Sequence, residues 1–355
     1  MFSFFRLVIL LWATILSVDN APGQDRGHQH ESPLDHAVEK LESPHSEPGS
    51  VPSAEPQSGA LKSFLLSWRL FRHSYLVGWL VGLLLALVGV IVVGRDQVFI
   101  GAAVSQASTL GIALALSASS VFPLHRGTDV WHGTSWLCCD SFQVVMAVAF
   151  SVLAALITSR ASRAGAESHE AITGWVFLVS ASLSVLVVAH SPHGLEEVNR
   201  IHSSSIIGAT ATDVWVFSLL LVATVVLLWA GGQRLLLFLM DPSMAAAVGM
   251  NVARWAVFES IWLGLVAGLS IRATGMLFTF GSLVLPALVA KNLCREVRPM
   301  FVVAPAVALL TNTVGFVLAN RYDFPPAQMN VALAGALLPL ASLVRGLRGA
   351  LARRS

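Results

Sequence analysis

Charged residues are scarce in this chain, and their scarcity excludes an ordinary soluble domain. Only 12% of the 355 residues are charged, whereas 55% are hydrophobic and the mean hydropathy is +0.72. The basic residues stand singly between apolar runs, a pattern that gives no indication of nucleic-acid binding. Cysteine is also rare, and Cys138, Cys139 and Cys294 cannot form a disulfide framework.

What the chain does contain is a succession of hydrophobic segments from Tyr75 to Val344, separated by short polar turns. Most are about 18 to 20 residues long, which at about 1.5 Å per residue spans a hydrocarbon core roughly 30 Å thick. Because lipid offers backbone groups no partners, such segments must be helices. The sequence therefore predicts an all-α, polytopic transmembrane bundle of about eight to nine spans. We place nine spans at about 75–93, 98–119, 141–158, 172–190, 213–230, 252–271, 273–290, 300–319 and 329–345.

Four further regions flank the predicted transmembrane domain, residues 75–345. Residues 1–18 have the pattern of a signal peptide or of an uncleaved signal anchor. Residues 19–59 are rich in Pro, Ser, Glu and His, and we expect this linker to be disordered. Residues 60–74 alternate apolar and basic residues at helical spacing, which is typical of an amphipathic interfacial helix. Residues 346–355 are predicted to be a basic cytoplasmic tail.

The distribution of Lys and Arg predicts a multi-pass protein of the plasma (inner) membrane with a cytoplasmic C-terminus. In that orientation, basic residues of the spans and loops lie inside about three times as often as outside. The residues before Tyr75 then lie outside, which agrees with an N-terminal signal sequence. However, Lys62, Arg69 and Arg72 would lie on the outer face, against the usual rule.

Four short motifs follow one another along the spans. Residues 101–107 (GAAVSQA) open the second span, and residues 241–252 (DPSMAAAVGMNV) follow a span that runs inward. Residues 274–290 contain TGMLF and then LVLPALVA, and residues 322–328 (YDFPPAQ) precede the last span. In order and spacing, residues 75–345 resemble the ABC transporter permeases that import zinc, manganese or iron.

This resemblance implies the cargo and the partners of a transporter subunit. A homodimeric pair of permease subunits would surround a central path, cytoplasmic ABC ATPase subunits would drive transport, and a periplasmic or surface metal-binding protein would deliver the metal. The cargo would be a divalent transition metal, zinc or manganese, with iron as a further option. The chain has no GxxxxGK[ST] motif, so we expect no enzyme here, no covalent cofactor, and ATP only on the partner subunit.

The motif at Asp241 has a local physical explanation. Aspartate can cap the first turn of a helix, and Pro242 suits the first helical position. The resemblance implies that this short helix, with Ala246 and Gly249, fits a groove on the ATPase and transmits its motion. An ordinary capped turn is the alternative.

The second span departs from the family at its metal-contacting positions. The family's Asp and His correspond here to Ala102 and Gln106, and an amide is a poor transition-metal ligand while alanine is none. Ser105, Ser108 and Thr109 complete a polar stripe, which either lines the permeation path or forms interhelical hydrogen bonds. A permease of the same fold with another cargo, such as a metal chelate, is therefore an alternative.

Glu259 lies within the sixth predicted span. A carboxylate at that depth is costly and indicates a function in the permeation path. Its expected partners are Arg254 or Arg272, unless it is protonated.

Further candidate metal ligands lie mostly outside the membrane, where imidazole and thiolate donors suit Zn²⁺. These candidates are His190, His193, His202, Cys138, Cys139 and Asp140. The N-terminal linker could hold metal loosely near an entrance through His28, His30, His36 and His45. Solvated histidines, an oxidised cysteine pair and a merely hydrophilic linker are the simpler alternatives. A non-transporting membrane protein that sequesters metal is a third hypothesis for the function.

Overall fold

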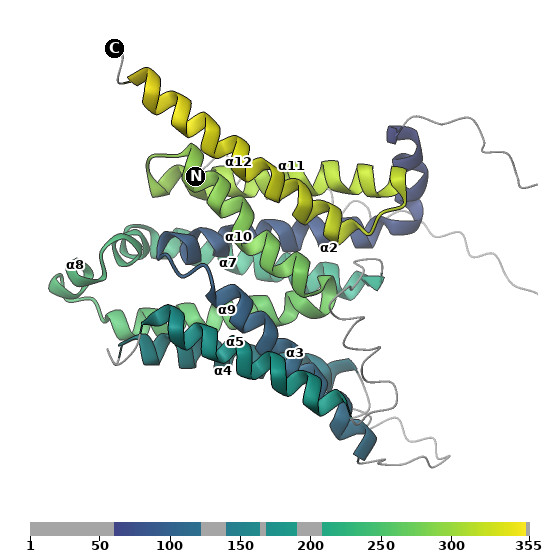
Figure 1. Cartoon of the computed structure of the whole chain (residues 1–355), viewed down its shortest axis with the longest axis horizontal. Helices are drawn as coiled ribbons and strands as arrows, with labels where there is room; N and C mark the ends of the chain where they lie inside the picture. Colours follow the sequence, from purple (N-terminus) through teal and green to yellow (C-terminus); the bar gives the residue numbers. More distant parts are fainter. Residues whose placement is uncertain (1–59, 122–139, 164–167, 190–207, 353–355) are drawn as a thin grey trace, which may run out of the picture. The chain divides into compact units, whose positions relative to one another are not determined.

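The computed structural model of the chain describes residues 60–121, 140–163, 168–189 and 208–352 (Figure 1). These residues are almost entirely helical, and no β-strand occurs among them. The predicted signal segment and linker, residues 1–59, lie outside the described part of the chain.

Nine helices in the described ranges are long and apolar enough to cross a membrane. Their lengths follow from the bilayer, because a span needs about 20 apolar residues. This confirms the predicted all-α transmembrane bundle. In chain order the helices are α2 (Ala60–Gly94), α3 (Ile100–Val121), α4 (Asp140–Arg163), α5 (His169–Val188), α7 (Ala211–Met240), the short α8 (Pro242–Ala247), α9 (Val252–Thr274), α10 (Met276–Leu293), α11 (Val297–Tyr322) and α12 (Pro326–Ala352).

Two predicted boundaries fall near a kink in α2 and within α12. The predicted interfacial helix, residues 60–74, and the first span are both part of α2, with non-helical backbone angles at Phe71 (φ −109°, ψ 17°). At the other end, α12 continues through Ala352, into the predicted basic tail. The kink at Phe71 therefore lies close to the predicted boundary at residue 74, whereas α12 continues past the predicted boundary at residue 345.

The first span is the centre of the bundle. Within Phe71–Gly94, 89% of the residues in an apolar 18-residue window are buried, whereas the corresponding share in α12 is only 22%. Helix α2 packs against α7, α10 and α11. Gly78 and Gly82 let α11 approach closely, and the Asn312 amide of α11 donates a hydrogen bond of 3.2 Å to the Gly78 carbonyl oxygen. Small residues at such spacing are typical of helix pairs in membranes.

A second close contact joins α9 to α4. A Cβ atom at Gly264 would lie 2.5 Å from the Cα of Val152, and one at Gly268 would lie 2.9 Å from the Cα of Val148. The glycines are four residues apart, as in other membrane helix pairs. This contact fixes α9, the helix that carries Glu259, against its neighbour.

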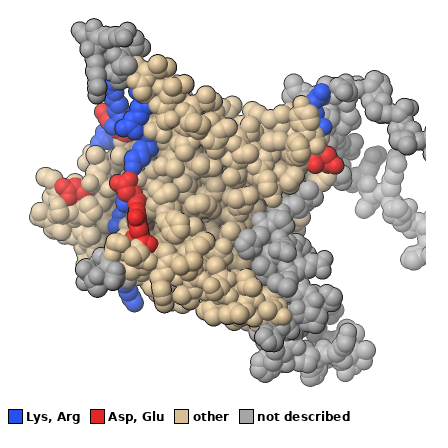
Figure 2. Space-filling model, viewed as in Figure 1, with Lys and Arg blue, Asp and Glu red and all other residues tan. Residues whose placement is uncertain are grey.

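Charged side chains gather at the end of the bundle where α8 lies (Figures 1 and 2). The described helix ends and turns on this side carry Arg95, Asp96, Arg160, Glu170, Arg234, Asp241, Arg254, Lys291, Arg295, Glu296, Arg298 and Arg345. The opposite ends carry fewer charges, among them Asp213, Arg272, Arg321 and Asp323. The two ends of the bundle therefore differ in electrostatic character.

Candidate functional site: helix α8 and the pocket beside Glu259

Helix α8 begins at Pro242, as the sequence predicts, because Asp241 caps it. One carboxylate oxygen of Asp241 accepts hydrogen bonds of 3.0 Å from the backbone N–H groups of Ser243 and Met244. It also accepts a hydrogen bond of 2.6 Å from the Ser243 hydroxyl. The Ser243 hydroxyl, and then the Met244 N–H, lower the pKa of Asp241 below its ordinary value of 3.8.

Most of α8 is exposed, and part of what it exposes is apolar. Within the helix only Ala245 is buried, while Ala246 is exposed. Met244 is 57% exposed and Val248 is 70% exposed. Gly249 then takes a positive φ of 86°, which ends the helix. A short exposed helix with apolar side chains beyond the membrane spans has the character of a protein-binding surface.

The polar stripe of α3 is buried inside the bundle. Ser105, Gln106, Ser108 and Thr109 are all buried, and Ala102 is half-buried. Helix α3 packs against α4, α5, α9 and α10. The Thr109 hydroxyl donates to the Ser105 carbonyl oxygen of its own helix, at 3.1 Å. Among the residues that the structure describes, the buried hydroxyls of Ser105 and Ser108 have no hydrogen-bond partner.

Glu259 lies about two turns into α9 and pairs with Arg95, the residue that follows α2. The expected partners, Arg254 and Arg272, were therefore wrong. Both lie on α9 itself, and neither spacing of five or thirteen residues brings a side chain onto the same patch of a helix as Glu259. Arg95 is 164 residues away in sequence, so only the packing of α2 against α9 reveals the pair.

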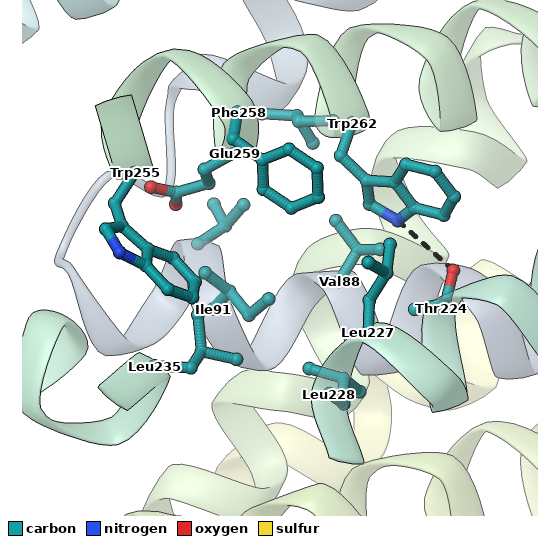
Figure 3. Close-up of a pocket in the computed structure, with 12 residues that line it drawn as sticks. Val88, Ile91, Thr224, Leu227, Leu228, Leu235, Trp255, Phe258, Glu259 and Trp262 are labelled. Atoms are coloured by element: carbon teal, nitrogen blue, oxygen red, sulfur yellow. Dashed lines mark hydrogen bonds between the residues drawn. The ribbon is translucent and has the colours of Figure 1, made fainter. Parts of the chain in front are cut away.

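A small pocket of about 40 Å³ lies beside Glu259, between α2, α7 and α9 (Figure 3). Trp255, Phe258 and Trp262 of α9 form one side of it, and aliphatic side chains of α2 and α7 form the other. The Trp262 indole donates a hydrogen bond of 3.1 Å to the Thr224 hydroxyl across the pocket. Its lining contains no residue of α3, so the structure does not bring Glu259 and the polar stripe of α3 together in this pocket.

Most of the predicted metal ligands lie outside the described residues. This holds for His190, His193, His202, Cys138, Cys139, His28, His30, His36 and His45. Asp140 is the first residue of α4. In the described ranges, no three His, Cys, Asp or Glu residues lie close enough together to hold a metal ion. These ligand sets stay predictions.

In the described part of the chain, nine spans agree with the prediction from hydropathy, and a capped, exposed α8 lies between the fifth and sixth of them. Residues 67–345 match the family model of the ABC 3 transport family. The chain belongs to this family. The match covers all four motifs and confirms the resemblance drawn from them.

Relatives and solved structures agree with this membership. The manganese transport system membrane protein MntC of Halalkalibacterium halodurans is 21% identical over 292 residues, which are 81% of this chain and 92% of the relative. PsaBC from Streptococcus pneumoniae, solved in complex with Fab, superposes with a TM-score of 0.64 at 18% identity, over 79% of this chain and 95% of that one. An inward-facing metal-chelate type ABC transporter gives a TM-score of 0.59 at 15% identity, over 81% and 91% of the two chains. This chain therefore has the fold of ABC transporter permeases.

Proposed function

We propose that this chain is the membrane subunit of an ABC importer for a divalent transition metal, manganese or zinc, with iron as the further option. The observation that carries the proposal is the match to MntC, a manganese transport protein, over 92% of that relative's length. The family match over residues 67–345 supports the same class. This function requires no enzymatic site in the chain, because a separate subunit hydrolyses ATP.

In this proposal α8 is the contact with the ATPase. Its exposed Met244 and Val248 would fit an apolar groove, and Asp241 would keep the helix formed. Two copies of the chain would enclose the path, and an external metal-binding protein would load it. Closure of the ATPase pair would move α8 and rock the spans between outward-open and inward-open states.

Metal uptake tests the proposal directly. Cells that lack the protein should lose high-affinity uptake of one metal, measured with radioactive manganese, zinc and iron at low external concentration. Expression of the intact chain should restore it. Normal uptake of all three metals in the deletion strain would contradict an importer.

Copurification separates this function from metal sequestration by a non-transporting protein. The intact protein, purified in mild detergent, should carry an ABC ATPase at matching stoichiometry. Metal that is retained without any ATPase, and is lost when residues 19–59 are deleted, would instead favour sequestration by the histidines of that segment.

A metal chelate is the second candidate cargo, and Ala102 and Gln106 favour it. Neither side chain is a good ligand for a bare transition metal; Gln106 lies on the polar stripe of α3, and Ala102 lies one turn before it. The double variant Ala102→Asp, Gln106→His tests this alternative. Faster uptake of the bare metal would support a path that works like that of the family, whereas unchanged or lost uptake would favour another mode of transport.

A further inference from the structure

Arg95 contacts two helices at once from the end of α2. Its guanidinium group pairs with the Glu259 carboxylate of α9, and both side chains are largely buried, at 18% and 12% exposure. The same group lies over the ring of Phe238 of α7, with 4.7 Å between the guanidinium carbon and the ring centroid. A guanidinium can do both, because its edge donates hydrogen bonds while its flat face stacks on an aromatic ring.

Phe238 belongs to a separate piece of α7. The backbone of Gly232 is non-helical (φ 33°, ψ −113°), so residues 233–240 form a distinct segment after this break, which we call the α7 terminal segment. It leads directly into Asp241, the cap of α8. Any restraint on this segment is therefore a restraint on the position of α8.

Three contacts hold the α7 terminal segment. Arg95 covers the fully buried Phe238 ring, and the Trp255 ring of α9 lies 6.3 Å from the same ring, between centroids. Leu239 packs on Gly94, the last residue of α2, since a Cβ there would lie 3.1 Å from the leucine side chain. The pocket of Figure 3 is lined by α7 residues on both sides of Gly232, with Leu228 before the break and Leu235 after it.

We propose that Arg95 is a positioning residue for transport: it fastens the α7 terminal segment, and with it α8, to α2 and α9. A force on α8 then moves both spans, instead of bending α7 at Gly232. The inference rests on the proposed function only in taking α8 as the place where the ATPase acts. The fastening itself is a property of the permease alone.

Distance measurements on the permease without ATPase test the fastening. Spin labels at Gln97→Cys and Ala247→Cys would report the separation of the α2 end and the end of α8 by pulsed electron resonance in lipid nanodiscs. The background would have every native cysteine replaced by serine, at positions Cys138, Cys139 and Cys294. The wild-type background should give one narrow distance distribution.

The informative variant is Phe238→Leu, which keeps an apolar side chain and the Arg95–Glu259 pair but removes the aromatic face. A cation–π contact of about 0.5–2 kcal/mol corresponds to a roughly 2- to 30-fold increase in the ratio of released to fastened α8. Phe217→Leu is the matched control, since Phe217 is equally buried on the same helix and no cation lies over its ring in the part of the chain that the structure describes. Unchanged distances in Phe238→Leu would overturn the proposal.

The charge exchange Arg95→Glu, Glu259→Arg separates positioning from stability. It restores an ion pair between α2 and α9, so the protein should be more stable than either single variant. It places a carboxylate where the cation faced the Phe238 ring, so α8 should stay released. Wild-type distances in the exchanged protein would show that the ion pair alone matters and would overturn the role of the stacked cation.

The number of ions transported per ATP hydrolysed tests whether holding α8 against α2 and α9 matters for transport. In proteoliposomes with the ATPase subunit, Phe238→Leu should still bind the ATPase but move fewer ions per ATP hydrolysed, in proportion to the fraction of released α8 that the distance measurements report. Unchanged stoichiometry with released α8 would overturn a role in transport. Failure of the wild-type permease to bind any ATPase would instead contradict the proposed function, while the distances would still decide whether Arg95 positions α8.

Discussion

Arg95 and Glu259 form a largely buried charged pair near the charged end of the bundle, and each charge depends on the other. Glu259→Gln leaves the arginine buried without its counter-charge, which should lower the free energy of unfolding by about 3–5 kcal/mol. The double variant Arg95→Gln, Glu259→Gln should cost less than the single variant, because no uncompensated charge remains. Chemical unfolding in detergent micelles measures both.

Glu296→Gln is the matched control for this cycle. Glu296 is exposed and makes no side-chain hydrogen bond to α11, so its loss should change stability by less than about 0.5 kcal/mol. If the double variant lost as much stability as the Arg95→Gln and Glu259→Gln single variants added together, the two charges would not interact.

The cap that Asp241 forms on α8 should affect how tightly the permease binds the ATPase. Asp241→Ala removes the acceptor for the Ser243 and Met244 N–H groups, so α8 should fray and ATPase binding should weaken. Asp241→Asn keeps a side-chain oxygen and should retain most of the binding. Titration of detergent-purified permease with the ATPase subunit compares the three proteins. Equal affinity in all of them would exclude a role of the cap.

The pH dependence of this cap follows from the direction of its shift. The pKa of Asp241 in the folded protein lies below its ordinary value of 3.8, so the carboxylate stabilises α8 fully above that pH. The contribution is lost only as the pH falls through the lowered pKa. ATPase binding should therefore show no titration from Asp241 in the neutral range.

At the scale of helices, the break in α7 depends on the backbone conformation of Gly232. Its φ of 33° with ψ of −113° is unfavourable for any residue with a Cβ atom, although a Cβ there would meet no other atom within 4 Å. Gly232→Ala should therefore cost about 1–3 kcal/mol through backbone strain alone, or straighten α7 and displace α8. Thermal unfolding and the spin-label distances distinguish these results.

Gly174→Ala in α5 is the control for this backbone effect. Gly174 also has open space around a Cβ, but it has ordinary helical angles, so alanine should be neutral or stabilise the helix by up to about 1 kcal/mol. Equal effects of the two substitutions would contradict strain at Gly232.

The helices could be predicted from the sequence far better than their contacts. Span lengths are set by bilayer thickness, and the start of α8 by the chemistry of Asp241 and Pro242, so both are local properties of the chain. The break at Gly232 lies within an apolar run and has no local signal beyond two adjacent glycines. The partner of Glu259 depends on helices far apart in sequence, which no spacing rule connects. The four-residue spacing of Gly264 and Gly268, by contrast, is a signal for a close helix contact that is present in the sequence itself.

For the whole molecule, the uneven charge of the two bundle ends predicts the orientation in the membrane. Basic side chains collect at the end where α8 lies, so we expect this end, and the C-terminus with it, to face the cytoplasm. An ATPase could reach α8 only in this orientation.

Two exposed alanines at opposite ends of the bundle, Ala211 and Ala247, offer matched cysteine positions in a background without native cysteines. A membrane-impermeant maleimide should label Ala211→Cys in intact cells and Ala247→Cys only after the membrane is opened. The reverse pattern would invert the topology and remove α8 from the reach of any cytoplasmic partner.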